Sequence, residues 1–331
     1  MWFEKLMGFK EENSSQVKKN IAIVGNRLIS KINNEEYIFG QLEIPSLEDL
    51  RNQSNSKEEY TSQIKVSEVI GDIQAIHQDP SNNNSVIQVA SQFNLLEMMN
   101  PNRVPEDGVG MYEYDATQGP ACAIACGAGT IYRNYFAKVD GQIGQTTTKQ
   151  IDCLNEIGIE LENNKHNYWE MKNGYALVSR NGLKTINEHI RDTSEKEYEY
   201  LKGKLSVGVQ WNSQVTIGLT QNLITQVYCS ALPVSYTNIE TELWSDFAKV
   251  ILEATYEATF YVALKNYERT GNNKIFLTLI GGGAFGNKPE WIFNAIAKSI
   301  KKFSKTPLDI KIVSHSTSNP HIKELIDSIK A

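Results

Sequence analysis

The sequence predicts an α/β fold, a sheet flanked by helices. The last third of the chain alternates strand and helix patterns, an order typical of a sheet flanked by helices. The chain has 331 residues, of which 40% are hydrophobic and 22% are charged. This is a normal globular balance, and the chain is long enough to bury a sizeable core.

The first part of the chain has β character. Residues 20–39 are expected to form strands with a turn at Asn33 and Asn34. The polar stretch over residues 52–63 is rich in loop formers and predicts a loop or a short, weak helix. We expect an N-terminal β-rich extension over residues 1–62 and a main domain over residues 63–331.

Two buried strands are predicted next, at residues 64–76 and 85–97, because β-branched residues dominate both stretches. The second stretch carries polar residues toward its end, at Ser91, Gln92 and Asn94. Open α/β sheets bind their ligands beyond the carboxyl ends of their strands. The end of this strand is therefore a candidate ligand site.

Residues 100–119 match neither the strand period nor the helix period and are strongly acidic. A loop of this length inside a compact domain is usually functional or disordered. Residues 120–136 are small throughout and begin with Pro120, which predicts a closely packed helix with Pro120 in its first turn.

The middle of the chain, residues 137–203, is interpreted as an insertion or lid without a catalytic role. Within it, residues 168–179 predict a hairpin with a turn at 172–174. Beyond the insertion we expect strands at 205–216 and 222–236, a long helix at 245–267, a strand at 274–280, a helix at 288–303, a strand at 308–315 and a helix at 320–330.

Charge and composition exclude some functions. The net charge of −6 gives no general attraction to nucleic acid or to anionic membranes. The first residues lack the apolar segment of a signal peptide, and no stretch is apolar enough to span a membrane, so a cytoplasmic protein is expected. The four cysteines lack metal-site spacing and are expected to be reduced core thiols.

The stretch "IGGGAFGN" at residues 280–287 lies between a predicted strand and a predicted helix. Glycines there permit positive φ and let backbone N–H groups approach a ligand, as in a nest for a phosphate or diphosphate. A tight turn without any ligand explains the cluster equally well. The spacing matches neither a dinucleotide fingerprint nor a P-loop.

Four segments in order resemble the macrodomains, a family that binds and hydrolyses ADP-ribose. They are "VIGDIQAI" at residues 69–76, "VIQVASQFN" at 86–94, "QGPACAIACGAG" at 118–129 and "GGGAFGNKP" at 281–289. The first loop is Gln-Gly-Pro-Ala where a glycine triplet is usual. The acidic loop before it is more like the divergent branch represented by the bacterial effector MavL.

This resemblance implies a three-layer α/β/α, macrodomain-like fold with a mixed sheet, and it also implies where ADP-ribose binds. Asp72 and the Ile73 backbone would hold the adenine, and Asn94 would face the distal ribose. Gln118 and Gly119 would contact the ligand at the start of a helix. The diphosphate loop would consist of Gly281, Gly282, Gly283, Ala284, Phe285, Gly286 and Asn287. Phe285 could pack on the distal ribose or close the sheet edge, and the two are weighed equally.

The acidic loop supplies the catalytic candidates. Cleavage of an ADP-ribosyl bond passes through an oxocarbenium-like state, which carboxylates assist by activating water and steadying charge. Glu97, Glu106, Asp107, Glu113 and Asp115 lie within one short stretch. Asp107 and Asp115 are the first choices and Glu106 is the third. For each of them a solvated loop charge or a helix cap is the alternative.

Other groups receive structural interpretations. Glu253 and Glu257 lie four residues apart, and a solvated helix edge is favoured over an acid pair or metal site. No metal is expected, because the histidines have no paired spacing, and no cofactor is expected, because the hydrolysis requires none. The predicted function is an ADP-ribosylhydrolase whose partners are ADP-ribose and ADP-ribosylated protein. A non-catalytic ADP-ribose reader is the alternative, and an enzyme acting on a free ADP-ribose derivative is the third possibility.

Overall fold

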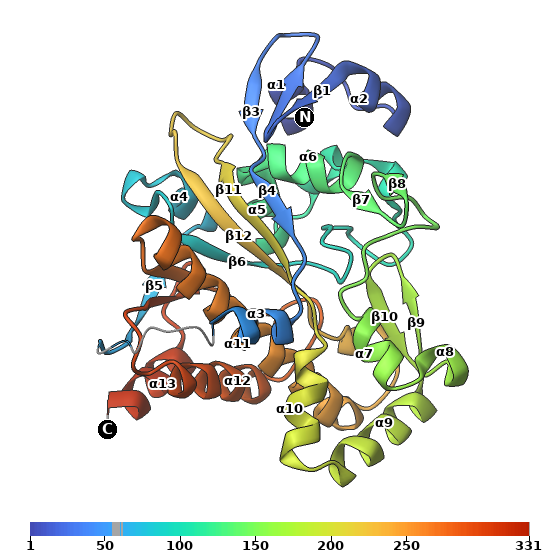
Figure 1. Cartoon of the computed structure of the whole chain (residues 1–331), viewed down its shortest axis with the longest axis vertical. Helices are drawn as coiled ribbons and strands as arrows, with labels where there is room; N and C mark the ends of the chain where they lie inside the picture. Colours follow the sequence, from blue (N-terminus) through green and yellow to red (C-terminus); the bar gives the residue numbers. More distant parts are fainter. Residues whose placement is uncertain (55–59, 61, 331) are drawn as a thin grey trace.

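The computed structural model describes residues 1–54, 60 and 62–330. Its centre is a seven-stranded sheet in the order β4-β11-β12-β6-β13-β14-β5 (Figure 1). The strands are β4 (Gln41–Glu43), β5 (Lys65–Ile70), β6 (Val86–Ala90), β11 (Gly208–Gln214), β12 (Leu223–Cys229), β13 (Lys274–Leu277) and β14 (Asp309–Ser314). The strands from β12 to β5 run parallel, while β11 and β4 are antiparallel to their neighbours. The predicted mixed sheet is confirmed.

Alternate residues of β12 face different helical layers. Thr225 bonds to Asn266 (3.0 Å), and the Cys229 thiol lies 3.5 Å from the Thr259 hydroxyl, both on the long helix α11. The intervening residue Gln226 donates to the Cys122 carbonyl at 2.8 Å, on the opposite face. This alternation follows from the two-residue period of a strand, and it puts the sheet between two helical layers.

One layer contains α11 (Ser245–Thr270), α12 (Pro289–Lys302), α10 (Glu195–Gly203), α9 (Arg180–Asp192) and α3 (Leu47–Ser54) (Figure 1). The other contains α4 (Ile73–Gln78), α5 (Gln118–Ala125) and α6 (Gly127–Tyr135), and α13 (Pro320–Lys330) packs on α12 and β5. Pro289 starts α12 as predicted. α11 runs over 26 residues, which confirms the predicted long helix, and most of it is buried.

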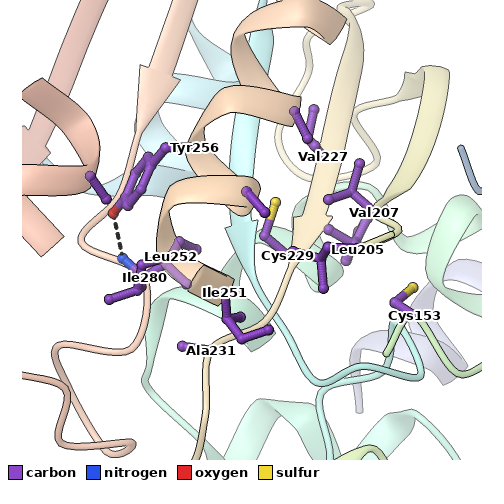
Figure 2. Packing of buried hydrophobic residues seen from close by; sticks show 14 of the residues in the cluster. Cys153, Leu205, Val207, Val227, Cys229, Ala231, Ile251, Leu252, Tyr256 and Ile280 are labelled. Atoms are coloured by element: carbon purple, nitrogen blue, oxygen red, sulfur yellow. Dashed lines mark hydrogen bonds between the residues drawn. The ribbon is translucent and has the colours of Figure 1, made fainter. Parts of the chain in front are cut away.

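The core under the carboxyl ends of the strands joins α11, β12 and the loop after β13 (Figure 2). Ile251, Leu252 and Ala231 are buried there. The Tyr256 hydroxyl accepts a hydrogen bond from the Ile280 N–H at 2.9 Å and donates one to the Thr278 carbonyl at 2.7 Å. A core side chain therefore holds the backbone immediately before the glycines.

The N-terminal part is only partly a separate unit. Strands β1 (Ile21–Val24), β2 (Arg27–Ser30) and β3 (Glu36–Ile38) form their own antiparallel sheet beside α1 (Trp2–Met7) and α2 (Ser14–Asn20), at the top of Figure 1. The predicted strands around the Asn33–Asn34 turn are thus present. However, β4 joins the central sheet by pairing with β11, and α3 packs on α11. The boundary between the two predicted domains stays a prediction.

The insertion contains the predicted hairpin, formed by β9 (Trp169–Lys172) and β10 (Tyr175–Val178). Its other elements are β7 (Lys138–Val139), β8 (Gln142–Ile143), α7 (Asn155–Glu160) and α8 (Asn163–His166), together with α9 and α10 of the helical layer. Short 3₁₀ turns are η1 (Pro80–Asn82), η2 (Pro105–Asp107), η3 (Gly110–Tyr114), η4 (Val234–Tyr236) and η5 (Thr241–Trp244). In the part of the chain that the structure describes, no helix is long and apolar enough to cross a bilayer.

Two predicted elements need correction, and a third is only partly described. The strand expected over residues 64–76 ends at Ile70, because Asp72 accepts from the Ala75 N–H at 3.0 Å and caps α4. The helix expected over residues 120–136 is broken at Cys126 into α5 and α6, and α5 starts two residues before Pro120. Of the polar stretch 52–63, residues 52–54 end α3, while residues 55–59 and 61 lie outside the described residues.

Glu253 and Glu257 do not form a solvated helix edge, so that interpretation was wrong. They are 6% and 3% exposed. Arg51 donates to both oxygens of Glu257, at 2.7 and 2.9 Å, and Lys202, Lys298 and Lys302 pair with the two carboxylates. Burial alone would raise the pKa of Glu257, but the Arg51 and Lys302 hydrogen bonds outweigh it and lower the pKa to about 2. This network ties α11 to α3, α10 and α12.

Candidate active site

A cavity of about 290 Å³ opens at the carboxyl ends of the central strands. Ala90 ends β6, Ala231 follows β12 and Thr278 follows β13, and all three line the cavity. This is the edge at which parallel sheets bind their ligands. The remaining walls come from the glycine-rich loop, the start of α5, the segment after β6 and the hairpin of the insertion.

The glycine-rich loop forms a fixed turn along one wall. Gly281 has φ +75°, and a Cβ there would lie 2.6 Å from the Ala231 Cβ, so the close approach requires glycine. Asn287 donates to the Leu232 carbonyl at 2.8 Å, and the Ser235 hydroxyl donates to the Ala284 carbonyl. Gly283 and Ala284 are exposed and line the cavity. Their backbone is therefore open to a ligand.

The first turn of α5 forms the opposite wall. Gln118 is locked to the end of β6, since its side-chain amide donates to the Gln88 carbonyl and accepts from the Ala90 N–H, both at 2.9 Å. A Cβ on Gly119 would lie 2.0 Å from the Ala90 carbonyl oxygen, so only glycine fits. The side chain of Gln118 is thus structural. The first-turn N–H groups have no acceptor within the helix and suit an anion.

Glu97 is the most unusual group in the cavity. Its side chain is 2% exposed, and its Oε1 has no hydrogen-bond partner among the described residues. Burial raises the pKa of Glu97 well above its ordinary value, and nearby Asp115 adds to the rise, while Arg133 opposes it. Glu97 therefore holds its proton at a pH where an exposed carboxyl group has lost it. Its raised pKa makes Glu97 a candidate general acid in the cavity.

Sequence reasoning placed Glu97 only among five nearby carboxylates and did not select it. The signal was present, because Glu97 lies inside the apolar run "LLEMM" at the end of a predicted buried strand. A lone charged residue in such a run must be paired or neutral when the run is buried. That rule would have singled it out.

Asp115 is the second carboxyl group in the cavity. It follows η3, is only partly buried, and its Oδ1 accepts from the Thr117 N–H at 2.9 Å. Two carboxyl groups in such different surroundings can divide the roles of acid and base.

An aromatic group closes a further side of the cavity. Tyr175, Tyr236 and Phe285 lie with ring centroids 5.2 to 5.5 Å apart. The Tyr175 hydroxyl donates to the Met98 carbonyl at 2.6 Å, next to Glu97. The insertion therefore contributes a wall of the cavity. Phe285 packs within this group and also lines the cavity, so its two alternatives are not exclusive.

The structure brings together part of the predicted site. Among the predicted site residues, those that line the cavity are Asp115, Gln118, Gly119, Gly281, Gly283, Ala284 and Phe285. Those outside its lining are Asp72, Ile73, Asn94, Glu106, Asp107, Gly282, Gly286 and Asn287. Asp72 caps α4, and Asn287 braces the glycine-rich loop. The adenine-binding role of Asp72 and Ile73 stays a prediction.

Asn94, Asp107 and Glu106 make contacts that hold loops together. Asn94 is fully buried and donates to the Gln150 side chain at 2.8 Å. Asp107 accepts from the Val104 N–H at 3.2 Å, and Glu106 accepts from the Thr147 N–H at 2.9 Å. These contacts anchor the acidic loop near the cavity, and a catalytic role for Asp107 or Glu106 stays a prediction.

No metal ligand set was found among the described residues, where no three His, Cys, Asp or Glu side chains are grouped as such a site requires. All four cysteines are buried and unpaired. The expectation that no cofactor takes part remains a prediction.

No family model and no curated protein matches the sequence. Among solved structures, the fold is similar to poly(ADP-ribose) glycohydrolase from Thermomonospora curvata bound to the inhibitor ADP-HPD. The TM-score is 0.46 and the identity 9%, over 96% of this chain and 97% of that chain. It is also similar to poly(ADP-ribose) glycohydrolase from Deinococcus radiodurans in complex with ADP-ribose, with TM-score 0.46 and 9% identity over 88% and 95% of the two chains. At this level of similarity, no residue role transfers to this chain.

Proposed function

We propose that this chain binds ADP-ribose in the cavity and hydrolyses an ADP-ribosyl bond to a modified protein side chain. The observation that carries the proposal is the pair of unlike carboxyl groups, buried Glu97 and more open Asp115, in one cavity with bare glycine backbone. The macrodomain-like motifs are the reason for proposing ADP-ribose as the ligand. The long acidic loop supports the divergent branch represented by MavL, which resembles hydrolases of ADP-ribosylated protein.

Each wall has a part in this reaction. The diphosphate binds against the backbone of Gly283 and Ala284 and the first turn of α5. Protonated Glu97 donates its proton to the side-chain atom that leaves the distal ribose C1″. Asp115 aligns a water molecule and takes its proton as the new C1″–O bond forms. The aromatic group excludes water from the other side of the ribose.

A non-catalytic reader of ADP-ribosylated protein is the second candidate. It is favoured by the structural contacts of Glu106 and Asp107, which leave two of the three predicted catalytic groups outside the cavity lining. A reader needs the glycine-rich loop but has no use for a buried protonated acid, which costs stability. Glu97 is the reason why we rank the hydrolase first.

The test combines calorimetric titration with ADP-ribose and a turnover assay on mono-ADP-ribosylated protein, for wild type, Asp107→Ala and Asp115→Ala. We expect wild type to bind and to turn over, and Asp115→Ala to bind without turnover. Absence of binding by wild type would refute the whole proposal. Binding without turnover on arginine-, acidic- and serine-linked substrates would leave the reader.

A further inference from the structure

The N-terminal arm, residues 1–11, contacts the acidic loop that carries Asp115. The Glu11 carboxylate accepts from the Val109 N–H at 3.0 Å and from the Gly110 N–H at 2.6 Å. It also accepts from the Tyr135 hydroxyl at 2.7 Å. One side chain from the start of the chain thus holds the first turn of η3 and joins it to α6.

The fit between Glu11 and the loop is close. A Cβ on Gly108 would lie 2.6 Å from the Glu11 Oε2, and a Cβ on Gly110 would lie 2.7 Å from it. Gly108 also has φ +85°, a conformation that other residues rarely adopt. The two glycines of "DGVG" are therefore explained by the approach of Glu11 as well as by the turn itself.

The rest of the arm reinforces this contact. The Trp2 N–H donates to the Glu113 carboxylate at 2.9 Å, and the Trp2 indole donates to the Val109 carbonyl at 3.2 Å. Phe3 and Met7 are fully buried in one hydrophobic cluster with Leu96 and Met98, the residues on either side of Glu97. The arm is packed against both segments that carry a cavity carboxyl group.

A short chain of contacts leads from Glu11 to the two carboxyl groups. Glu11 holds Gly110 at the start of η3, and the hydroxyl of Tyr112, two residues on, accepts from the Glu97 N–H at 3.0 Å. Asp115 directly follows η3. A shift of η3 would therefore move Asp115 and the backbone of Glu97 together.

We propose that the N-terminal arm is a strap that positions the two cavity carboxyl groups, with Glu11 as the positioning residue. The expected effect on kcat rests on the proposed function, whereas the expected effect on the position of η3 does not. Glu11 does not line the cavity, so it acts through η3 and touches no substrate. Small misplacements of catalytic groups cost large factors in rate while binding contacts survive.

The test compares Glu11→Gln with Glu12→Gln, which makes the same change at the neighbouring, exposed side chain. Glutamine keeps the shape but loses the charge, and its NH₂ group would face a backbone N–H. For Glu11→Gln we expect kcat to fall at least about tenfold, with the ADP-ribose Kd within about threefold of wild type. Hydrogen exchange of the Val109 and Gly110 amides should accelerate. Glu12→Gln should match wild type in all three measurements.

A double-mutant cycle separates positioning from general destabilisation. In a Glu97→Gln background, the added effect of Glu11→Gln on kcat should be smaller than in wild type, because the part that acts through the Glu97 proton is already lost and only the part that acts through Asp115 remains. Equal losses in both backgrounds would overturn the inference. So would unchanged amide exchange in Glu11→Gln. If wild type neither binds ADP-ribose nor hydrolyses the substrate, the proposed function fails. Amide exchange then still tests whether Glu11 holds η3 in place.

Discussion

Glu97→Gln tests the central chemical claim, because it keeps the size of the side chain and removes its acidic proton. Loss of a positioned general acid typically lowers kcat by about 10²–10⁴-fold, which is about 3–5 kcal/mol of barrier. The glycine-rich loop and the start of α5 are untouched, so the ADP-ribose Kd should stay within about threefold of wild type. Turnover on mono-ADP-ribosylated protein and calorimetry measure the two effects, with Glu188→Gln, an exposed residue of α9, as the matched control.

The same substitution should change how stability depends on pH. The folded pKa of Glu97 lies above its ordinary value of 4.5, so between these two pH values the folded state binds a proton that the unfolded state has released. Wild type therefore loses stability as pH rises through 4.5, by up to about 1.4 kcal/mol for each pH unit, until the folded pKa is reached. The glutamine variant lacks this loss.

Urea unfolding of both proteins between pH 4 and 7 measures the difference. We expect Glu97→Gln to gain stability relative to wild type as pH rises, and to show no such gain below pH 4.5, where the carboxyl group is neutral in both states. A difference that is constant with pH would refute a buried, protonated Glu97. Turnover within about threefold of wild type would refute its role as the acid.

Four further substitutions test the cavity and the ion-pair network. Asp115→Asn should lower turnover about 10²-fold with ADP-ribose binding retained, while Asp107→Asn, outside the cavity lining, should lose less than about tenfold; equal losses would contradict the assignment. Gly119→Ala should cost about 1–3 kcal/mol and weaken ADP-ribose binding, because the Cβ would overlap the Ala90 carbonyl; a thermal melt and calorimetry that match wild type would rule this out. Glu257→Gln should cost about 3 kcal/mol at pH 7. The pKa of Glu257 is lowered to about 2, so its stabilisation is complete above pH 4.5 and lost as pH falls toward 2, and a deficit that persisted at pH 2 in unfolding experiments would argue against the network.

The parts of the fold that could be predicted are those in which local pattern and tertiary position agree. Residues 245–267 carry helical periodicity and fall within α11, and Pro289 marks the start of α12. The strand predicted at residues 73–76 was wrong. The β-branched residues there favour a strand, but the Asp72 cap and packing against α5 make the segment a helix.

The parts of the site that depend on local backbone conformation could be predicted from the sequence. The parts that depend on contacts with residues far away in the chain could not. The bare turn at Gly281 follows from glycine alone. The raised pKa of Glu97 depends on its burial by loops whose positions cannot be inferred from the sequence. The buried state of Glu253 and Glu257 depends on cations from three other helices, Arg51 among them. The sequence puts Asp107 and Asp115 in one acidic loop, and only the fold shows that Asp115 lines the cavity and Asp107 does not.

The walls of the cavity come from stretches near residues 90–99, 115–120, 175, 231–236 and 278–285, which are spread over most of the chain. A ligand that bridges these stretches binds only when all of them are folded at once, so its binding energy adds to the cohesion of the whole molecule. At a hundred times its Kd, such a ligand would stabilise the fold by about 2.7 kcal/mol. ADP-ribose would then stabilise the whole fold, and a destabilising substitution in any layer would lower the affinity for ADP-ribose.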